Sequence, residues 1–179
     1  MSRTPEPSCP VGIITISDRA FNGIYEDLGG PALKSAAESY GWRVLEAAVV
    51  PDDKSAIQQA VLGEIAKGCR LILTTGGTGV GPRDVTPEAV RGIASRELPG
   101  FGETLRRESL KSTPNALLSR SLAAAVGPAL VICLPGNPAG AVECLGFVAE
   151  AVPHCLDLLE GLPEGHRHSR SRSGEKRTK

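Results

Sequence analysis

The apolar residues of this chain fall into two kinds of segment that alternate along the sequence. Short runs are apolar nearly throughout, which is typical of strands buried on both faces of a sheet. Such runs lie at 11–16, 71–73 and 130–134, and a further strand is predicted at 42–50. Between them, apolar residues recur every three or four positions, as on one face of a helix. The stripes predict helices at 31–40, 54–67, from about 87, 101–110, from about 138 to a break at Pro153, and 154–160.

Strands alternating with helices predict an α/β fold with three layers, in which helices flank a mostly parallel, Rossmann-like sheet. We expect residues 1–9 to be a loose lead-in, 10–162 to form a single α/β domain, and 163–179 to be a disordered basic tail. The segment 113–127 has no clear pattern. In such sheets ligands bind beyond the carboxyl ends of the strands, so the turns there are the first candidates for function.

The richest of these turns is a glycine loop between the strand at 71 and the helix near 87. The loop contains Gly76, Gly77, Thr78, Gly79 and Gly81. Glycine lets a backbone turn sharply and approach a ligand, and glycine amides and threonine hydroxyls can donate to phosphate oxygens. A hydroxyl, a proline and an acid at residues 86–88 predict a helix start with Thr86 as its N-cap. The loop therefore indicates an anion or nucleotide site, with a flexible turn as the plainer alternative.

Two well-known phosphate loops do not fit this sequence. A P-loop needs lysine and then Ser or Thr after its last glycine, but Pro82 and Arg83 follow Gly81. The dinucleotide fingerprint needs a third glycine at the position of Pro82. The sequence therefore disfavours a nucleotide-dependent oxidoreductase, although observed binding of NAD would support that class of protein.

Further polar turns follow the other predicted strands. They are Ser17-Asp18-Arg19, Pro51-Asp52-Asp53 and Pro135-Gly136-Asn137-Pro138. The predicted fold brings them together with Asp84 in one crevice. Asp52 and Asp84 have two open roles: each could cap the helix that follows it, or each could bind a metal ion.

Composition narrows the class of protein. Aromatic residues make up 3% of the chain, so the core must be aliphatic. No apolar run is long enough for a membrane span, and no basic segment followed by an apolar one marks a secretory signal. The five cysteines lack a Cys-x-x-Cys pair, which favours free thiols in a reducing cytoplasm. We therefore expect a cytoplasmic protein without membrane contact.

The zero net charge is unevenly spread, because residues 166–179 carry +5 and no apolar residue. Such a tail cannot bury enough surface to fold. It could bind RNA or a membrane surface, but it lacks aromatic side chains on which bases could stack, so we expect a solvated end and no nucleic acid partner.

Taken together, these turns resemble the molybdopterin adenylyltransferase family, the group that includes Mog and the G-domains of gephyrin and plant Cnx. The resemblance covers residues 11 to about 160. It rests on Ile16-Ser-Asp-Arg19, Asp27-Leu-Gly-Gly-Pro31, Pro51-Asp52, the segment Thr74–Glu88, Pro99-Gly-Phe101, Leu118-Ser-Arg120 and Leu134-Pro-Gly-Asn-Pro138. The basic tail and the proline-bearing N-terminus lie outside the family pattern.

The resemblance implies a molybdopterin-binding fold and a reaction in which Mg²⁺ and ATP adenylylate the phosphate of molybdopterin and release pyrophosphate. It implies that Asp52 and Asp84 act in catalysis and hold Mg²⁺. The implied nucleotide-binding residues are Gly76, Gly77, Thr78, Gly79, Pro135, Gly136, Asn137 and Pro138. The implied molybdopterin-binding residues are Ser17, Asp18, Arg19, Ser109, Ser119 and Arg120. It also implies a homotrimer and a hand-over of product to a separate molybdenum insertase. Because some relatives are catalytically silent, a module that binds the pterin or a protein is the alternative.

Deleting residues 166–179 is expected to leave folding and adenylylation nearly unchanged, because the tail has no apolar side chain to pack. The melting temperature and the rate of pyrophosphate release of the truncated and full chains test this. A truncated protein that melts much earlier, or that loses activity, would contradict it.

Overall fold

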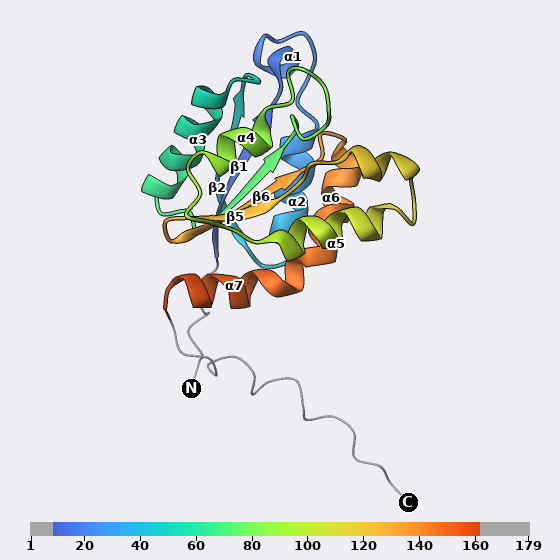
Figure 1. Ribbon diagram of the computed structural model, residues 1–179. Coiled ribbons are helices and arrows are strands. Elements are labelled where there is room, and N and C mark those ends of the chain that lie inside the picture. The colour runs from blue at the N-terminus through green and yellow to red at the C-terminus, as the bar shows by residue number, and fades with distance from the viewer. Residues whose placement is uncertain (1–8, 162–179) are drawn as a thin grey trace, which may run out of the picture.

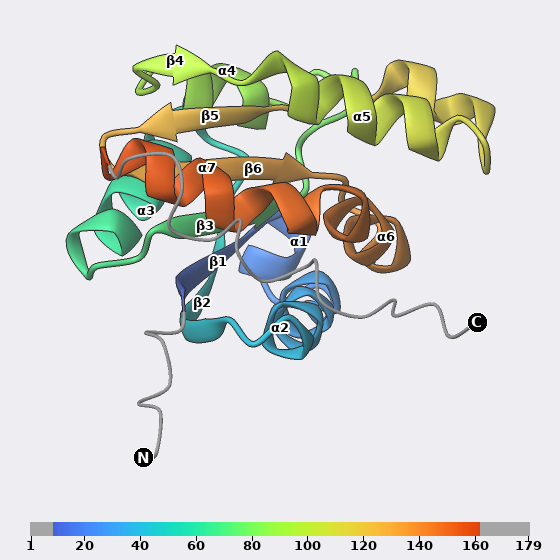
Figure 2. The ribbon, with the colours of Figure 1, turned by 90° about the horizontal axis from the view of Figure 1, so that it is seen from below.

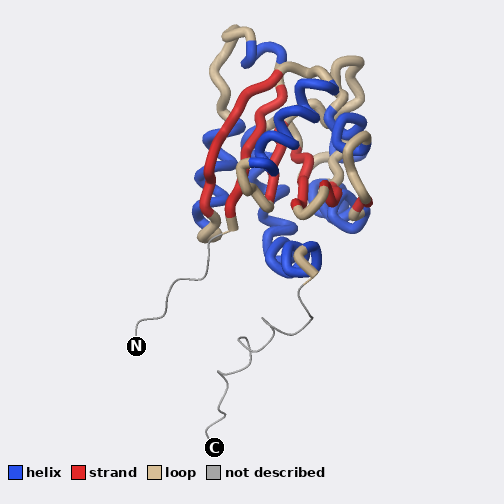
Figure 3. Tube along the Cα trace, turned by 90° about the vertical axis from the view of Figure 1, so that its left-hand side faces the viewer, coloured by secondary structure: helices blue, strands red, loops and turns tan. Residues whose placement is uncertain are grey.

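The computed structural model describes residues 9–161, which are organised around one six-stranded sheet. The strands are β1 Pro10–Ile16, β2 Arg43–Val50, β3 Leu71–Thr75, β4 Arg96–Glu97, β5 Ala123–Val126 and β6 Ala129–Leu134. Their spatial order is β2-β1-β3-β6-β5-β4. The four strands from β2 to β6 are parallel, whereas β5 and β4 run antiparallel at one edge. Figure 3 shows the strands side by side with helices around them.

Helices cover both faces of the sheet, so the predicted three-layer α/β class is confirmed (Figures 1 and 2). They are α1 Asp18–Phe21, α2 Gly29–Ser39, α3 Lys54–Ala66, α4 Thr86–Arg91, α5 Pro99–Ser109, α6 Pro138–Val148 and α7 Val152–Leu159, with short 3₁₀ turns η1 Pro114–Leu118 and η2 Ala149–Ala151. Side chains alternate across each strand. Val11 and Ile13 pack with α2, α5, α6 and α7, while Ile14 and Ile16 pack with α3 and α4. Burial on both faces explains why β1, β3 and β6 read as continuous apolar runs, whereas the edge strand β2 is largely exposed.

Several element boundaries differ from the sequence-based expectation. The helix predicted to run from about 138 to Pro153 ends earlier, at Val148. Pro153 lies instead in the first turn of the next helix, α7, where no backbone N–H is needed. Helix α2 begins at Gly29 rather than at residue 31. Its first amides are satisfied by Asp27, whose Oδ1 accepts from the N–H groups of Gly29 and Gly30 at 3.0 Å each. The unassigned segment 113–127 contains η1 and β5.

Residues 1–8 of the lead-in predicted at 1–9, and the tail predicted at 163–179, lie outside the described residues. Between residues 9 and 161, no helix combines the length and the apolar character needed to cross a bilayer. None of the five cysteines, all of which lie in this range, forms a disulfide bond.

The chain order of the strands creates a switch point. From β1 the chain moves outward to the edge strand β2 and then returns past β1 to β3 on its other side. In open α/β sheets, a crevice that can hold a ligand forms outside the carboxyl ends of the strands where the order reverses. The turn after β1 and the glycine loop after β3 flank this point.

Candidate functional site

A crevice of about 340 Å³ lies at the switch point. It unites turns that follow four different strands, as the sequence predicted. Of the candidate residues it is lined by Ser17 after β1, Asp52 after β2, Gly76, Gly77 and Asp84 after β3, and Gly136 and Pro138 after β6. Among residues 9–161, its lining includes four acids, which are Glu26, Asp27, Asp52 and Asp84, and neither lysine nor arginine.

The glycine loop can follow its path only with glycine at two positions. Gly76 has φ +106°, and a Cβ there would lie 2.1 Å from the carbonyl oxygen of Ile16. Gly77 has φ +62°, and a Cβ there would lie 2.4 Å from Oγ1 of Thr86. Both the left-handed backbone and the close packing exclude a side chain.

The loop also determines which amides face a ligand. The amide of Gly76 already donates to the carbonyl of Leu134 at 3.3 Å, so it is not the phosphate donor that the sequence suggested. Within the described part of the chain, the amides of Gly77 and Gly79 have no acceptor. Of the two, Gly77 lines the crevice and Gly79 does not, so the Gly77 amide is the one placed to donate to an anion there.

Asp52 is not a helix cap. Its neighbour Asp53 caps α3 by accepting from the amide of Ala56 at 2.9 Å. Asp52 instead exchanges hydrogen bonds with Asp18: Oδ2 of Asp52 accepts from the Asp18 amide at 2.8 Å, and Oδ1 of Asp18 accepts from the Asp52 amide at 3.0 Å. Burial raises the pKa of Asp52 above its usual range, the Asp18 amide opposes this, and the charges of Asp18 and Asp84 add to it. A carboxylate in this setting gains from a nearby cation.

Asp18 was predicted to contact the pterin, but its carboxylate is already paired. Nε of Arg83 donates to the Asp18 carboxylate at 2.9 Å. Hydrogen bonding from the Arg83 side chain lowers the pKa of Asp18. Asp18 thus joins the turn after β1 to the glycine loop. The neighbouring Arg19 lies over the ring of Tyr25, with its guanidinium carbon 4.5 Å from the ring centroid.

Asp84 is not a helix cap either. Helix α4 begins after Val85, which makes no side-chain cap, so the prediction of Thr86 as N-cap is wrong. The Thr86 hydroxyl donates to the carbonyl of Gly76 at 2.9 Å and fastens the loop. Asp84 accepts from the amide of Gly81 at 2.7 Å and lines the crevice near Asp52.

A second, larger pocket of about 670 Å³ lies beyond the turn that follows β6. It contains the candidates Ser109, Ser119, Pro135 and Asn137, so the predicted pterin ligands are divided between two cavities. Asn137 Oδ1 caps α6 by accepting from the amide of Gly140 at 2.9 Å. The only arginine or lysine lining this pocket in the described chain is Arg106. Sequence reasoning missed it, although it stands one helical turn before Ser109.

Two of the sequence candidates support the loop from outside the crevice. Thr78 is buried, and its carbonyl accepts from the amide of Arg120 at 2.8 Å. The Arg120 guanidinium donates to backbone carbonyls of the loop and to Glu88 rather than pointing into either pocket with free nitrogens.

Fold and site together define an α/β protein with a glycine loop and two carboxylates, Asp52 and Asp84, at a topological switch point. A family model described as "Probable molybdopterin binding domain" matches residues 12–154. The chain belongs to this family of molybdopterin-binding domains.

Individual relatives agree with this assignment. A protein of Helicobacter pylori strain J99 named molybdopterin adenylyltransferase is 42% identical over 154 residues, which cover 84% of this chain and 88% of the relative. The protein of that name from Escherichia coli K12 is 41% identical over 167 residues, covering 84% and 85%. The solved structure of the molybdopterin biosynthesis enzyme MoaB from Thermus thermophilus superposes with a TM-score of 0.80 at 41% identity, covering 87% of this chain and 99% of that one.

Proposed function

We propose that this protein is a molybdopterin adenylyltransferase, which transfers AMP from ATP to the phosphate of molybdopterin and releases pyrophosphate. The observation that carries the proposal is the crevice in which Asp52, Asp84 and the free amide of Gly77 meet. The second pocket borders this crevice through the turn at residues 135–138, so two substrates have room side by side. The named activity of relatives at about 41% identity supports the same reaction.

The reaction needs positioning and charge neutralisation more than covalent help from the protein. An oxygen of the pterin phosphate attacks the α-phosphorus of ATP, a new P–O bond forms, and the bond from that phosphorus to the bridging oxygen breaks. Pyrophosphate leaves with the electron pair. The amide of Gly77 would donate to a phosphate oxygen as charge builds on it.

The acids of the crevice make a cation necessary. A polyphosphate would be repelled by Asp52 and Asp84, because no basic side chain lines the crevice to offset them. No group of three metal-ligating side chains occurs between residues 9 and 161. Two carboxylates fit magnesium, which is usually bound through one or two of them and completes its shell with water and substrate phosphates. When bound, Mg²⁺ would neutralise phosphate charge.

We assign the nucleotide to the crevice and the pterin to the second pocket. Gly136 and Pro138 line the nucleotide side, and Ser109 and Ser119 line the pterin side. Arg106 adds a cation to that pocket, where a pterin phosphate would be attracted to it. Ser17 lies with Asp52, where the two substrates would meet.

Some properties implied by the family remain proposals for this chain. We propose a homotrimer, which sedimentation equilibrium would test, and transfer of the product to a separate molybdenum insertase. The free thiols support a reducing, cytoplasmic location.

Purified protein with ATP, Mg²⁺ and molybdopterin is expected to release pyrophosphate and form adenylylated pterin. Omitting Mg²⁺ should abolish turnover, and ATP should raise the melting temperature only when Mg²⁺ is present, because the acids repel the free nucleotide. Binding of molybdopterin without turnover would indicate a silent binding module instead. Stabilisation by ATP alone would contradict the role of the metal.

A further inference from the structure

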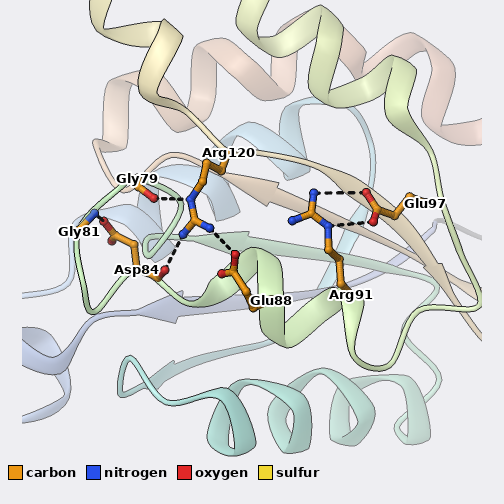
Figure 4. A network of polar contacts seen from close by, with 7 residues as sticks. All are labelled: Gly79, Gly81, Asp84, Glu88, Arg91, Glu97 and Arg120. Atoms are coloured by element: carbon orange, nitrogen blue, oxygen red, sulfur yellow. Dashed lines mark hydrogen bonds and ion pairs between the residues drawn. The ribbon is translucent and has the colours of Figure 1, made fainter.

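Arg120 reaches the glycine loop from a distant part of the chain. It lies just after η1, and each of its three guanidinium nitrogens donates to an acceptor on or beside the loop (Figure 4). Nε donates to the carbonyl of Gly79 at 2.6 Å and one terminal nitrogen to the carbonyl of Asp84 at 2.6 Å. The other terminal nitrogen donates to Glu88 on α4.

These two carbonyls bracket the tip of the loop, residues 80–83. Arg83 in this tip is held from outside by its ion pair with Asp18, and few other contacts among the described residues hold the rest of it. Val80 is 66% exposed, and the internal bonds of the tip are those between Gly81 and Asp84, in which the Asp84 amide donates to the Gly81 carbonyl and the Gly81 amide to Oδ2 of Asp84. The tip therefore depends on an anchor outside itself.

The shape of the tip determines where the Asp84 carboxylate lies. A Cβ at Gly79 or at Gly81 would approach Oδ2 of Asp84 to 2.9 or 2.8 Å, so this oxygen lies against the backbone of both residues. By holding the carbonyls of Gly79 and Asp84, Arg120 fixes both ends of the segment that surrounds Oδ2 of Asp84. Arg120 thus acts on Asp84 through the backbone and without touching its carboxylate.

We infer that Arg120 is a positioning residue, which Glu88 orients and which holds the glycine loop so that Asp84 faces the nucleotide crevice. This role differs from the pterin contact that the sequence suggested, because the guanidinium nitrogens are already occupied by protein acceptors. Lysine could not replace arginine here, since a single ammonium group on a flexible stem cannot span three acceptors as the planar fork does. The inference rests on the proposed function for its kinetic consequence but not for its structural one.

The test compares Arg120→Lys with Arg91→Lys in the full chain. Arg91, on the same helix as Glu88, pairs with exposed Glu97 outside both cavities, so it is a matched control for loss of an arginine–carboxylate pair (Figure 4). Amide hydrogen exchange of Gly81 and Asp84, measured by NMR without substrates, is expected to accelerate at least about tenfold in Arg120→Lys and to stay unchanged in Arg91→Lys. Unchanged exchange in Arg120→Lys would overturn the inference.

Kinetics then separate the two roles of Arg120. If Arg120 supports the loop, the KM for Mg-ATP should rise about tenfold or more in Arg120→Lys, while the KM for molybdopterin should stay within about twofold. The reverse pattern would make Arg120 a pterin ligand and overturn the inference.

A wild-type protein without adenylylation would refute the proposed function, and the exchange measurement would still decide the structural role. If Arg120→Lys does not fold, Glu88→Gln should accelerate exchange at the same two amides, and no acceleration there would count against the inference.

Discussion

Replacing Asp84 by asparagine is expected to reduce turnover on the order of 10²-fold or more while the melting temperature stays nearly the same. Asparagine keeps the shape of the side chain and an oxygen that can accept from the Gly81 amide at 2.7 Å. It removes the negative charge that would hold Mg²⁺ in the crevice. The rate of adenylylated pterin formation and the melting curve should be measured on the same preparation.

Asp53 provides a matched control for this substitution. It stands next to Asp52 but caps α3, and asparagine caps a helix about as well as aspartate does. Asp53→Asn should therefore keep full activity, whereas Asp52→Asn should behave like Asp84→Asn. Full turnover in Asp84→Asn would refute the proposed role of this carboxylate.

Replacing Gly76 by alanine is expected to destabilise the fold and to abolish activity. The added Cβ would meet the Ile16 carbonyl oxygen at 2.1 Å, and the backbone at φ +106° disfavours any side chain. Strain of this kind costs on the order of 1–3 kcal/mol, and the clash with a backbone atom of β1 adds to it. Chemical denaturation and the adenylylation assay give the two readouts.

Gly23 is the control that separates the cost of the left-handed backbone from the cost of the steric clash. It has φ +69°, but a Cβ there would meet nothing within 4 Å. Gly23→Ala should therefore cost about 1 kcal/mol and leave activity intact. Equal losses at both positions would show that the close packing of the loop against β1 does not matter.

Much of the fold could be predicted from local pattern, because a buried strand and a one-sided helix each leave a periodic signature. The apolar runs that became β1, β3 and β6 and the apolar stripe that became α3 are of this kind. The strand β5 left no such signature: its sequence is Ala-Ala-Ala-Val, and alanine favours strands weakly. It is a strand because it lies between β6 and β4, which is a tertiary cause.

The sequence by itself determined the fold class, the turns that carry chemistry and the family resemblance, because each depends on residue types at short spacing. Only the tertiary structure decided which acid caps a helix and which lines the crevice, since Asp52 and Asp53 are equivalent in the sequence and differ in what surrounds them. It also divided the predicted pterin residues between two cavities and directed Arg120 to the loop. Those assignments depend on contacts between residues about forty positions apart, such as Arg120 and Gly79, and a local pattern contains no information about such contacts.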